Sequence, residues 1–184
     1  MRKITKIMII MILTVLVLTG CNTSNGAGES KKEKKSPQPL ALQVLKMDEA
    51  EGITLENNDV YKEISEIISE NPNLGIPDDF SIQIHDVVEN IVGTNDTLAF
   101  LAINRLDEPL KNVYFEYTLG NNEGEYVFDE TRINLTESEV GVIQAHSVVP
   151  FYVEVTEEQI ESFRTLVPEN YVMKFDNFTF ESAK

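Results

Sequence analysis

Two histidines and one cysteine are the residues of this 184-residue chain that most readily do chemistry. His85 precedes Asp86, a pair suited to acting as a base or a metal ligand, but no neighbouring spacing supplies further ligands. His146 precedes Ser147, yet a serine nucleophile also needs an orienting acid and an oxyanion hole. The sequence has no Gly-x-Ser-x-Gly, His-Glu-x-x-His or phosphate-binding glycine motif. We therefore predict that the protein is not an enzyme and has no cofactor, that His85 lies on the outer face of a strand and that His146 is a turn residue.

Carboxylates are the other candidate chemical groups, because Asp and Glu outnumber Lys and Arg by 31 to 15 and the net charge is −16. Ca²⁺ prefers oxygen ligands, but no EF-hand spacing occurs. We predict no dedicated metal site, with weak cation binding by acidic loops as the alternative, at Asp78-Asp79, at 121–125 or at Asp129-Glu130. The same charge opposes contact with nucleic-acid phosphates, so no nucleic-acid partner is expected.

The single cysteine stands at the end of an N-terminal segment with three parts. A basic start at Arg2, Lys3 and Lys6 is followed by a mainly apolar stretch over residues 7–19 and then by Cys21. The apolar stretch is shorter than the roughly 20 residues that a transmembrane helix needs. One cysteine also excludes an internal disulfide framework.

The ending Leu18-Thr19-Gly20-Cys21 resembles the lipobox of bacterial lipoproteins. The resemblance implies a signal peptide over residues 1–20, cleavage between Gly20 and Cys21, and lipidation of Cys21 with diacylglycerol and palmitate-type chains. Two or more acyl chains anchor a protein stably, so we expect the lipid bilayer as a partner. The location would be the extracytoplasmic face of the cell membrane. The alternatives are a secreted protein cleaved nearby and an uncleaved anchor.

Residues 21–39 are expected to form the lipidated N-terminus and a flexible tether. From residue 22 onward the segment is rich in Ser, Gly, Asn, Pro and Lys and has no aliphatic side chain larger than alanine. Its lysine cluster at 31–35 would either contact anionic lipid or wall polymer or serve as a solvated spacer, and we favour the spacer.

Residues 40–184 are expected to form one acidic domain. Only Glu29 and Glu33 of the 31 acids precede it, as do seven of the 15 bases, so it has 29 acids, eight bases and a net charge of −21. Such a domain attracts cations or basic partners. Two helical segments are predicted. One lies near 58–70, with Asn58 or Asp59 as its cap and an apolar stripe of Val60, Ile64, Ile67 and Ile68. The other lies near 157–167, opened by a capping box at Thr156–Gln159, with Ile160, Phe163 and Val167 facing inward.

Strand patterns fill most of the remaining domain, near residues 40–47, 80–85, 97–104, 113–119, 126–129, 132–135, 140–143, 147–155 and 171–180. Pro150 predicts an edge or bulged strand, and a change of apolar parity in the last strand predicts a bulge near Asp176-Asn177. We predict a mainly β fold, an antiparallel immunoglobulin-like β-sandwich of about seven strands with one or two short helices.

The part of the chain from Phe80 to Glu181 resembles the immunoglobulin-like domains of Gram-positive lipoproteins and surface-layer-assembly proteins. The segments that carry the resemblance are AFLAIN at 99–104, KNVYFEYTLGNNEGEY at 111–126 and GVIQAHSVVPFYVEV at 141–155. The resemblance implies a surface lipoprotein that acts as a non-catalytic binding or interaction module for an envelope protein. The alternatives are an accessory factor in envelope, surface-layer or transport assembly, and a small-ligand or cation-binding lipoprotein.

Tyr114 and Tyr152 are the candidate partner-binding residues, because each lies outside the apolar parity of its strand. Exposed tyrosines on a sandwich face suit protein recognition. In the alternative interpretation both faces are covered, one of them by the 58–70 helix, and the tyrosines are partly buried.

Overall fold

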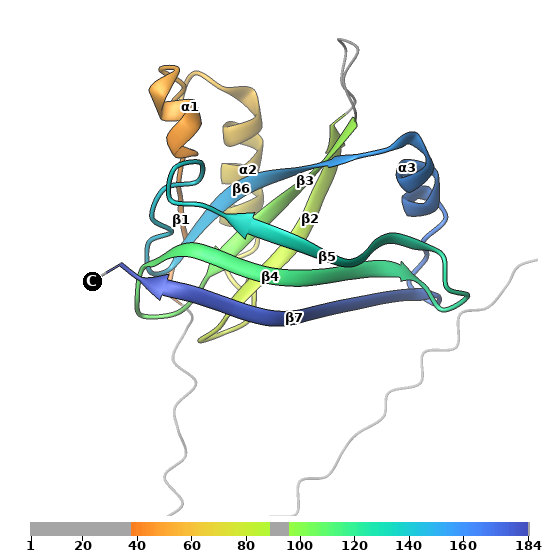
Figure 1. Ribbon diagram of the computed structural model, residues 1–184. Helices are drawn as coiled ribbons and strands as arrows, with labels where there is room; N and C mark the ends of the chain where they lie inside the picture. The colour runs from red at the N-terminus through yellow and green to blue at the C-terminus, as the bar shows by residue number, and fades with distance from the viewer. Residues whose placement is uncertain (1–37, 89–95, 184) are drawn as a thin grey trace, which may run out of the picture. The chain divides into compact units, whose positions relative to one another are not determined.

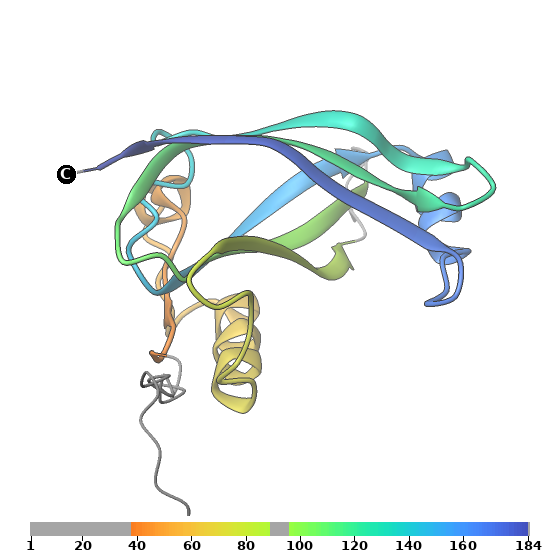
Figure 2. The same ribbon diagram turned by 90° about the horizontal axis from the view of Figure 1, so that it is seen from below.

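The structure, a computed structural model, describes residues 38–88 and 96–183, and two facing β-sheets dominate this part of the chain (Figures 1 and 2). The first sheet has the order β1-β6-β3-β2, built from Ala41–Leu42 (β1), Phe80–Val88 (β2), Asp96–Asn104 (β3) and Ser147–Val155 (β6). The second has the order β5-β4-β7, built from Leu110–Asn121 (β4), Tyr126–Leu135 (β5) and Tyr171–Ser182 (β7). Every strand pair is antiparallel except the short β1–β6 pair. The predicted mainly β sandwich of about seven strands is confirmed, while the immunoglobulin-like resemblance remains a prediction.

The inner faces of the two sheets form the main hydrophobic core. Phe100 of β3 stacks on Phe151 of β6 with 5.0 Å between ring centroids, and it meets Tyr117 of β4 edge-on at 5.8 Å. At the sheet edges, Phe80 of β2 stacks on Phe178 of β7 at 5.0 Å. These aromatic pairs tie the sheets together because offset or edge-on ring contacts add to the free energy of burying the rings.

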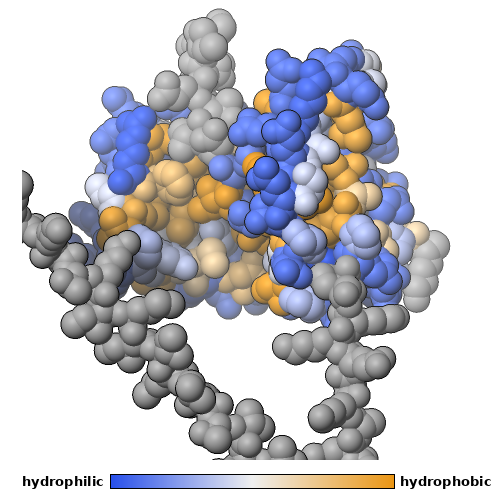
Figure 3. Space-filling model, turned by 180° about the vertical axis from the view of Figure 1, so that it is seen from behind, coloured by the Kyte–Doolittle hydropathy of each residue, from blue (hydrophilic) through white to orange (hydrophobic). Residues whose placement is uncertain are grey.

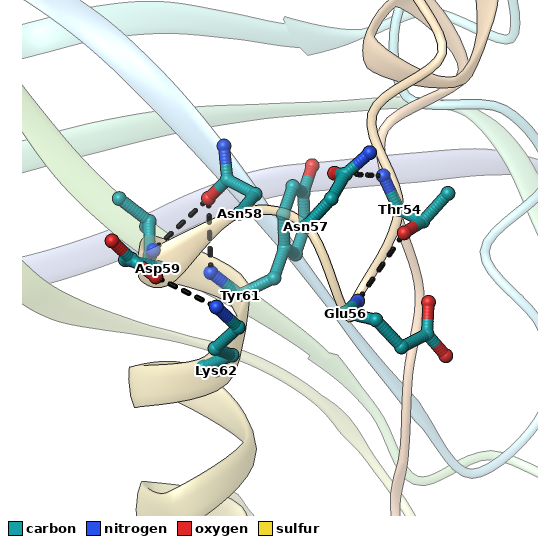
Figure 4. Close-up of polar contacts among 8 residues, drawn as sticks. Thr54, Glu56, Asn57, Asn58, Asp59, Tyr61 and Lys62 are labelled. Carbon is teal, nitrogen blue, oxygen red and sulfur yellow. Dashed lines mark hydrogen bonds and ion pairs between the residues drawn. The ribbon is translucent and has the colours of Figure 1, made fainter.

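The helix α2 (Asp59–Glu70) covers part of the outer face of the first sheet (Figure 2). Its N-terminus is capped by Asn58, whose side-chain oxygen accepts hydrogen bonds from the amides of Val60 and Tyr61 (Figure 4). Ile64 packs with Leu101, Ile103 and Val148 in a second apolar cluster. The predicted stripe is wrong at Val60, which is 39% exposed, because the face that the helix buries begins at Tyr61 instead.

Two other helices flank the sheets. The short α1 (Lys46–Ala50) lies where the sequence predicted the end of a strand over 40–47, of which only Ala41–Leu42 pairs, with Ser147 and Val148. The predicted capping box of α3 (Glu157–Arg164) is confirmed: Thr156 and Gln159 satisfy each other's amides at 3.2 and 2.8 Å. Because α3 ends at Arg164, Val167 is not on its inner face and is 47% exposed.

The strand β5 joins two strands that the sequence predicted separately. The register between β4 and β5 shifts between Tyr117 and Leu119 of β4, opposite Glu130 of β5, whose φ is +44°. The strand β5 therefore continues through this irregularity instead of ending there. The predicted strand over 140–143 is wrong, because only the isolated Leu110–Ile143 bridge forms there.

Of the two predicted irregularities of the sheets, the bulge in β7 is confirmed, and the edge position of Pro150 holds only locally. β6 lies between β1 and β3 without a register shift, but β1 pairs with it only at Ser147 and Val148, so at Pro150 it has β3 alone beside it. In β7, Asn177 has a φ of +52°, and two residues of β7, Asn177 and Phe178, stand against one of β4 between the pairs Tyr114–Thr179 and Glu116–Asp176. This extra residue is the bulge that reconciles the two apolar parities of the last strand.

Candidate interaction surfaces

The lipidation and cleavage residues, Cys21 and Gly20, lie outside the described residues, as does the predicted tether up to residue 37. Among the residues that the structure does describe, no helix is long and apolar enough to cross a membrane.

Tyr114 lies on the outer face of the second sheet and takes part in a polar network centred on Glu116. Its hydroxyl donates to one carboxylate oxygen of Glu116 at 2.7 Å, and Asn177 donates to the other at 2.6 Å. Arg132 of β5 lies 3.7 Å from the same carboxylate. The hydrogen bonds from Tyr114 and Asn177 lower the pKa of Glu116, and the bond to Glu116 raises the pKa of Tyr114. The hydroxyl of the half-buried Tyr114 therefore already donates a hydrogen bond within its own sheet.

Tyr152 lies on the outer face of the other sheet, opposite Ala99 of β3. Its side chain is 41% exposed. Partial burial raises the pKa of Tyr152, and the negative charge of Asp48 in α1 raises it further. Asp48 also accepts a hydrogen bond of 2.6 Å from Tyr61 of α2, and the Tyr61 oxygen accepts one from the Leu45 amide at 2.9 Å. Tyr152 thus borders the packed junction of α1, α2 and β6.

The structure does not bring the two candidate tyrosines together. Tyr114 belongs to β4 and Tyr152 to β6, and each faces away from the core between the two sheets. A single partner surface therefore cannot be centred on both residues. Tyr152 remains a candidate contact beside α2, and Tyr114 remains one on the polar sheet face.

The two histidines occupy separate places. His85 falls at the register shift of β2, between Ile84 and Asp86, and is partly buried. His146 is in the turn before β6 with a φ of +52°, as the sequence predicted, and its Nε2 lies 2.8 Å from an Asp107 oxygen. The adjacent Ser147 hydroxyl lies instead within 2.6 Å of the Gln43 side chain and 2.7 Å of the Gln144 carbonyl. His146 and Ser147 therefore contact different partners.

Two buried polar residues, the last residue of β3 and the one that follows it, hold the neighbouring loops through hydrogen bonds. Asn104 donates to the carbonyls of Glu108 and Gln144, both at 2.9 Å, and accepts from the Leu106 amide at 3.0 Å. Arg105 is 3% exposed and donates to three backbone carbonyls, those of Gln38, Pro72 and Leu74, at 3.0, 2.8 and 2.6 Å. Burial lowers the pKa of Arg105. These contacts are structural, because they satisfy backbone groups that loops leave unpaired.

The acidic loops do not converge on a cation site within the described residues, where no group of three or more His, Cys, Asp or Glu side chains could hold a metal ion. At the β4–β5 turn, Asn121 donates to the Glu125 carboxylate at 2.9 Å, and its oxygen accepts the amides of Glu123 and Glu125. This loop cluster is thus a turn held by Asn121.

A shallow groove of about 760 Å³ lies between α3 and the start of β5. Its lining includes the carboxylates of Glu125, Glu158 and Glu161 and the half-exposed ring of Tyr126. Glu161 already pairs with Arg164 at 2.6 Å. The groove combines negative charge with an aromatic face, a chemistry suited to an organic cation.

The strand β7 carries the surface that the sequence analysis missed. More of the exposed large apolar side chains lie on β7 than on any other described element: Tyr171 at 51%, Met173 at 52% and Phe180 at 36%. Met173 pairs with Leu119, which belongs to the main core, so Met173 faces the core side of the sheet and is nevertheless half exposed. We call the free edge of β7 with these three side chains the β7 edge surface.

Partly exposed apolar side chains also occur on elements other than β7. They pack against the main core from β2, β6, α3, β7 and two loops, among them Ile84 of β2, Phe163 of α3 and Phe175 of β7. Seen from behind, hydrophobic side chains gather in a broad area beside α2 rather than standing singly (Figure 3). The signal for this surface was in the sequence: Tyr171, Met173 and Phe175 alternate as one apolar face, but alternation does not show whether a second sheet covers that face.

The fold defines the described part of the chain as a two-sheet β-sandwich domain with flanking helices. No protein-family model matches the chain, and no curated protein matches it. A solved structure that resembles it is the trimeric lipoprotein SadB of Salmonella enterica, with 12% sequence identity and a TM-score of 0.33 over 74% of this chain and 81% of that chain.

Proposed function

We propose that this protein is a membrane-anchored lipoprotein whose acidic β-sandwich acts as a non-catalytic interaction module at the extracytoplasmic face of the cell membrane. The anchor is the acylated Cys21, proposed from the lipobox Leu18-Thr19-Gly20-Cys21. The module binds an envelope protein.

The observation that carries the proposal is the β7 edge surface. Half-exposed Tyr171 and Met173 leave apolar area open to water beside the core, which costs free energy that a bound partner would recover. Aromatic residues and methionine are the types enriched in the centres of protein interfaces. The negative charge of the domain would add specificity for partners of opposite charge.

The experiment is crosslinking in living cells of the source organism with the full-length chain, followed by mass spectrometry of the captured species. Cys21→Ser separates anchoring from recognition, because loss of the acyl chains should release the protein from membranes without altering the sandwich. Met173→Ser tests the surface, and Met47→Ser is its matched control, since Met47 in α1 is 53% exposed.

We expect one envelope protein to be captured by the unaltered chain and by Met47→Ser, and to be lost with Met173→Ser. Membrane partitioning that Cys21→Ser leaves unchanged would contradict the anchor. Equal capture by Met173→Ser and Met47→Ser would contradict the proposed role of the β7 edge surface in binding.

A second candidate function, binding of a small organic cation, is favoured by the groove between α3 and β5. Of its three glutamates, Glu125 already accepts from Asn121 and Glu161 pairs with Arg164, so an ammonium group would contact Glu158 and the Tyr126 ring. Thermal unfolding with and without millimolar putrescine tests it: a rise in Tm that Tyr126→Ala abolishes supports this function, and an unchanged Tm rejects it.

A further inference from the structure

The strand β7 is an edge strand with a long regular stretch. It pairs with β4 on one side, and no described strand pairs with its other side. From Tyr171 to Asp176 the register with β4 runs without a shift, and the bulge comes only at Asn177. Six consecutive residues of an extended strand span about 20 Å, so the free edge offers a row of backbone donors and acceptors of that length.

The two faces of this stretch differ in chemistry. Tyr171 and Met173 lie on the core side and are half exposed. Lys174 and Asp176 alternate with them on the outer side. A strand added at this edge would place every second side chain over the open apolar area and the others in water. The edge therefore favours a segment that alternates apolar and polar residues.

Charge decides between the possible occupants. The folded region carries 29 acids and eight bases, and the stretch 169–182 has three acids, Glu169, Asp176 and Glu181, against the single base Lys174. Two copies joined at this edge would bring together two domains of net charge −21, which repel each other. A basic segment would instead be attracted.

We propose that the free edge of β7 between Tyr171 and Asp176 binds an extended basic segment of a partner protein, which adds to the β5-β4-β7 sheet as a fourth strand. The proposal rests on the interaction module proposed above and names its partner's chemistry. Backbone hydrogen bonds supply affinity, apolar side chains of the segment cover Met173 and Tyr171, and lysine or arginine side chains on the opposite face complement the acidic domain.

The test uses the full-length lipidated protein in a non-ionic detergent and three fluorescent seven-residue peptides. The first alternates lysine and valine, the second has the same side chains with every second backbone nitrogen methylated, and the third alternates glutamate and valine. Methylation removes the donors that an added strand needs while keeping charge and apolar area. We expect the lysine–valine peptide to bind at least tenfold more tightly than the other two in fluorescence anisotropy.

The protein variants locate the binding. Met173→Ser should weaken the lysine–valine peptide about fivefold or more, and Met47→Ser should change its Kd less than twofold. A version of the peptide with a diazirine in place of one valine should crosslink within 171–176 of the unaltered protein, which keeps the test valid if Met173→Ser folds poorly.

Three results would overturn the proposal. Equal binding of the methylated peptide would show attraction by charge alone. Crosslinks that map outside 171–176 would place the peptide elsewhere. A dimer in sedimentation that Met173→Ser abolishes would identify a second copy of this chain as the occupant. None of these results removes the interaction module itself, which depends on capture of an envelope protein in cells.

Discussion

Arg105 donates from Nη1 to the backbone carbonyl of Gln38, 67 residues earlier in the chain, at 3.0 Å. Gln38 precedes β1, so the guanidinium links the segment before β1 to the residue that follows β3. The same group also holds the segment that follows α2, through the carbonyls of Pro72 and Leu74. Among the described residues no carboxylate forms a salt bridge with Arg105, so backbone oxygens alone stabilise this buried charge.

Replacing Arg105 should therefore loosen the start of the domain. Arg105→Met removes the donors to the buried Leu74 carbonyl and to the partly buried carbonyls of Gln38 and Pro72, and we expect a loss of about 2–4 kcal/mol in the free energy of unfolding. Urea unfolding followed by circular dichroism measures it. Arg132→Met, at an exposed arginine of the outer sheet face, should change stability by less than about 0.5 kcal/mol. Equal effects of the two substitutions would contradict the assigned role.

Asn104 should be nearly as sensitive because it joins two loops. In Asn104→Ala the Leu106 amide and the Glu108 carbonyl lose their side-chain partner, and the Gln144 carbonyl keeps only the Ser147 hydroxyl, which should cost about 2–3 kcal/mol. Asn134→Ala, on the exposed face of β5, serves as the control. Amide hydrogen exchange should show faster exchange at residues 104–110 and 143–147 in Asn104→Ala only. Unchanged exchange there would show that the loops hold together without this side chain.

Alkaline pH should destabilise the domain through its buried phenols. Burial is the main cause that raises the pKa values of Tyr61 and Tyr117 above the ordinary value of 10. Because the pKa of each phenol is higher in the folded than in the unfolded state, its contribution to the free energy of unfolding is fully present below pH 10 and is lost as the pH increases above it. Absorbance at 295 nm should show these two tyrosines ionising together with unfolding rather than before it. Their ionisation in a domain that is still folded would contradict this prediction.

Acid should weaken the outer sheet face through Glu116. Its pKa is lowered from the ordinary 4.5, first by the hydrogen bond from Tyr114 and then by that from Asn177. A lowered folded-state pKa contributes stability above pH 4.5 that disappears as the pH falls through the lowered value. Urea unfolding at pH 7 and at pH 3 should therefore show a smaller pH dependence in Glu116→Gln than in the unaltered protein. Glu154→Gln on the other sheet is the matched control for the loss of one carboxylate, and an effect equal to that of Glu116→Gln would contradict this prediction.

Local features were predictable from the sequence because their hydrogen bonds join residues a few positions apart. The Asn58 cap and the capping box at Thr156–Gln159 are of this kind. The bulge at Asn177 was predictable for another reason, because the change of apolar parity within one strand indicates it, although its contacts are with the distant strand β4. The lipobox at 18–21 is equally local, and its consequences remain predictions. The helix stripe was wrong at Val60 for the opposite reason: which side of α2 is buried depends on where Leu101 and Val148 of distant strands lie.

The candidate surfaces show the same division. Sequence parity placed Tyr114 and Tyr152 outside the core, and composition determined the acidic character of the domain. Only the tertiary structure assigned the two tyrosines to opposite sheets and made β7 an edge strand with Met173 half exposed. Alternation of side chains is a property of one strand, whereas an edge exists only when all strands have been ordered into sheets.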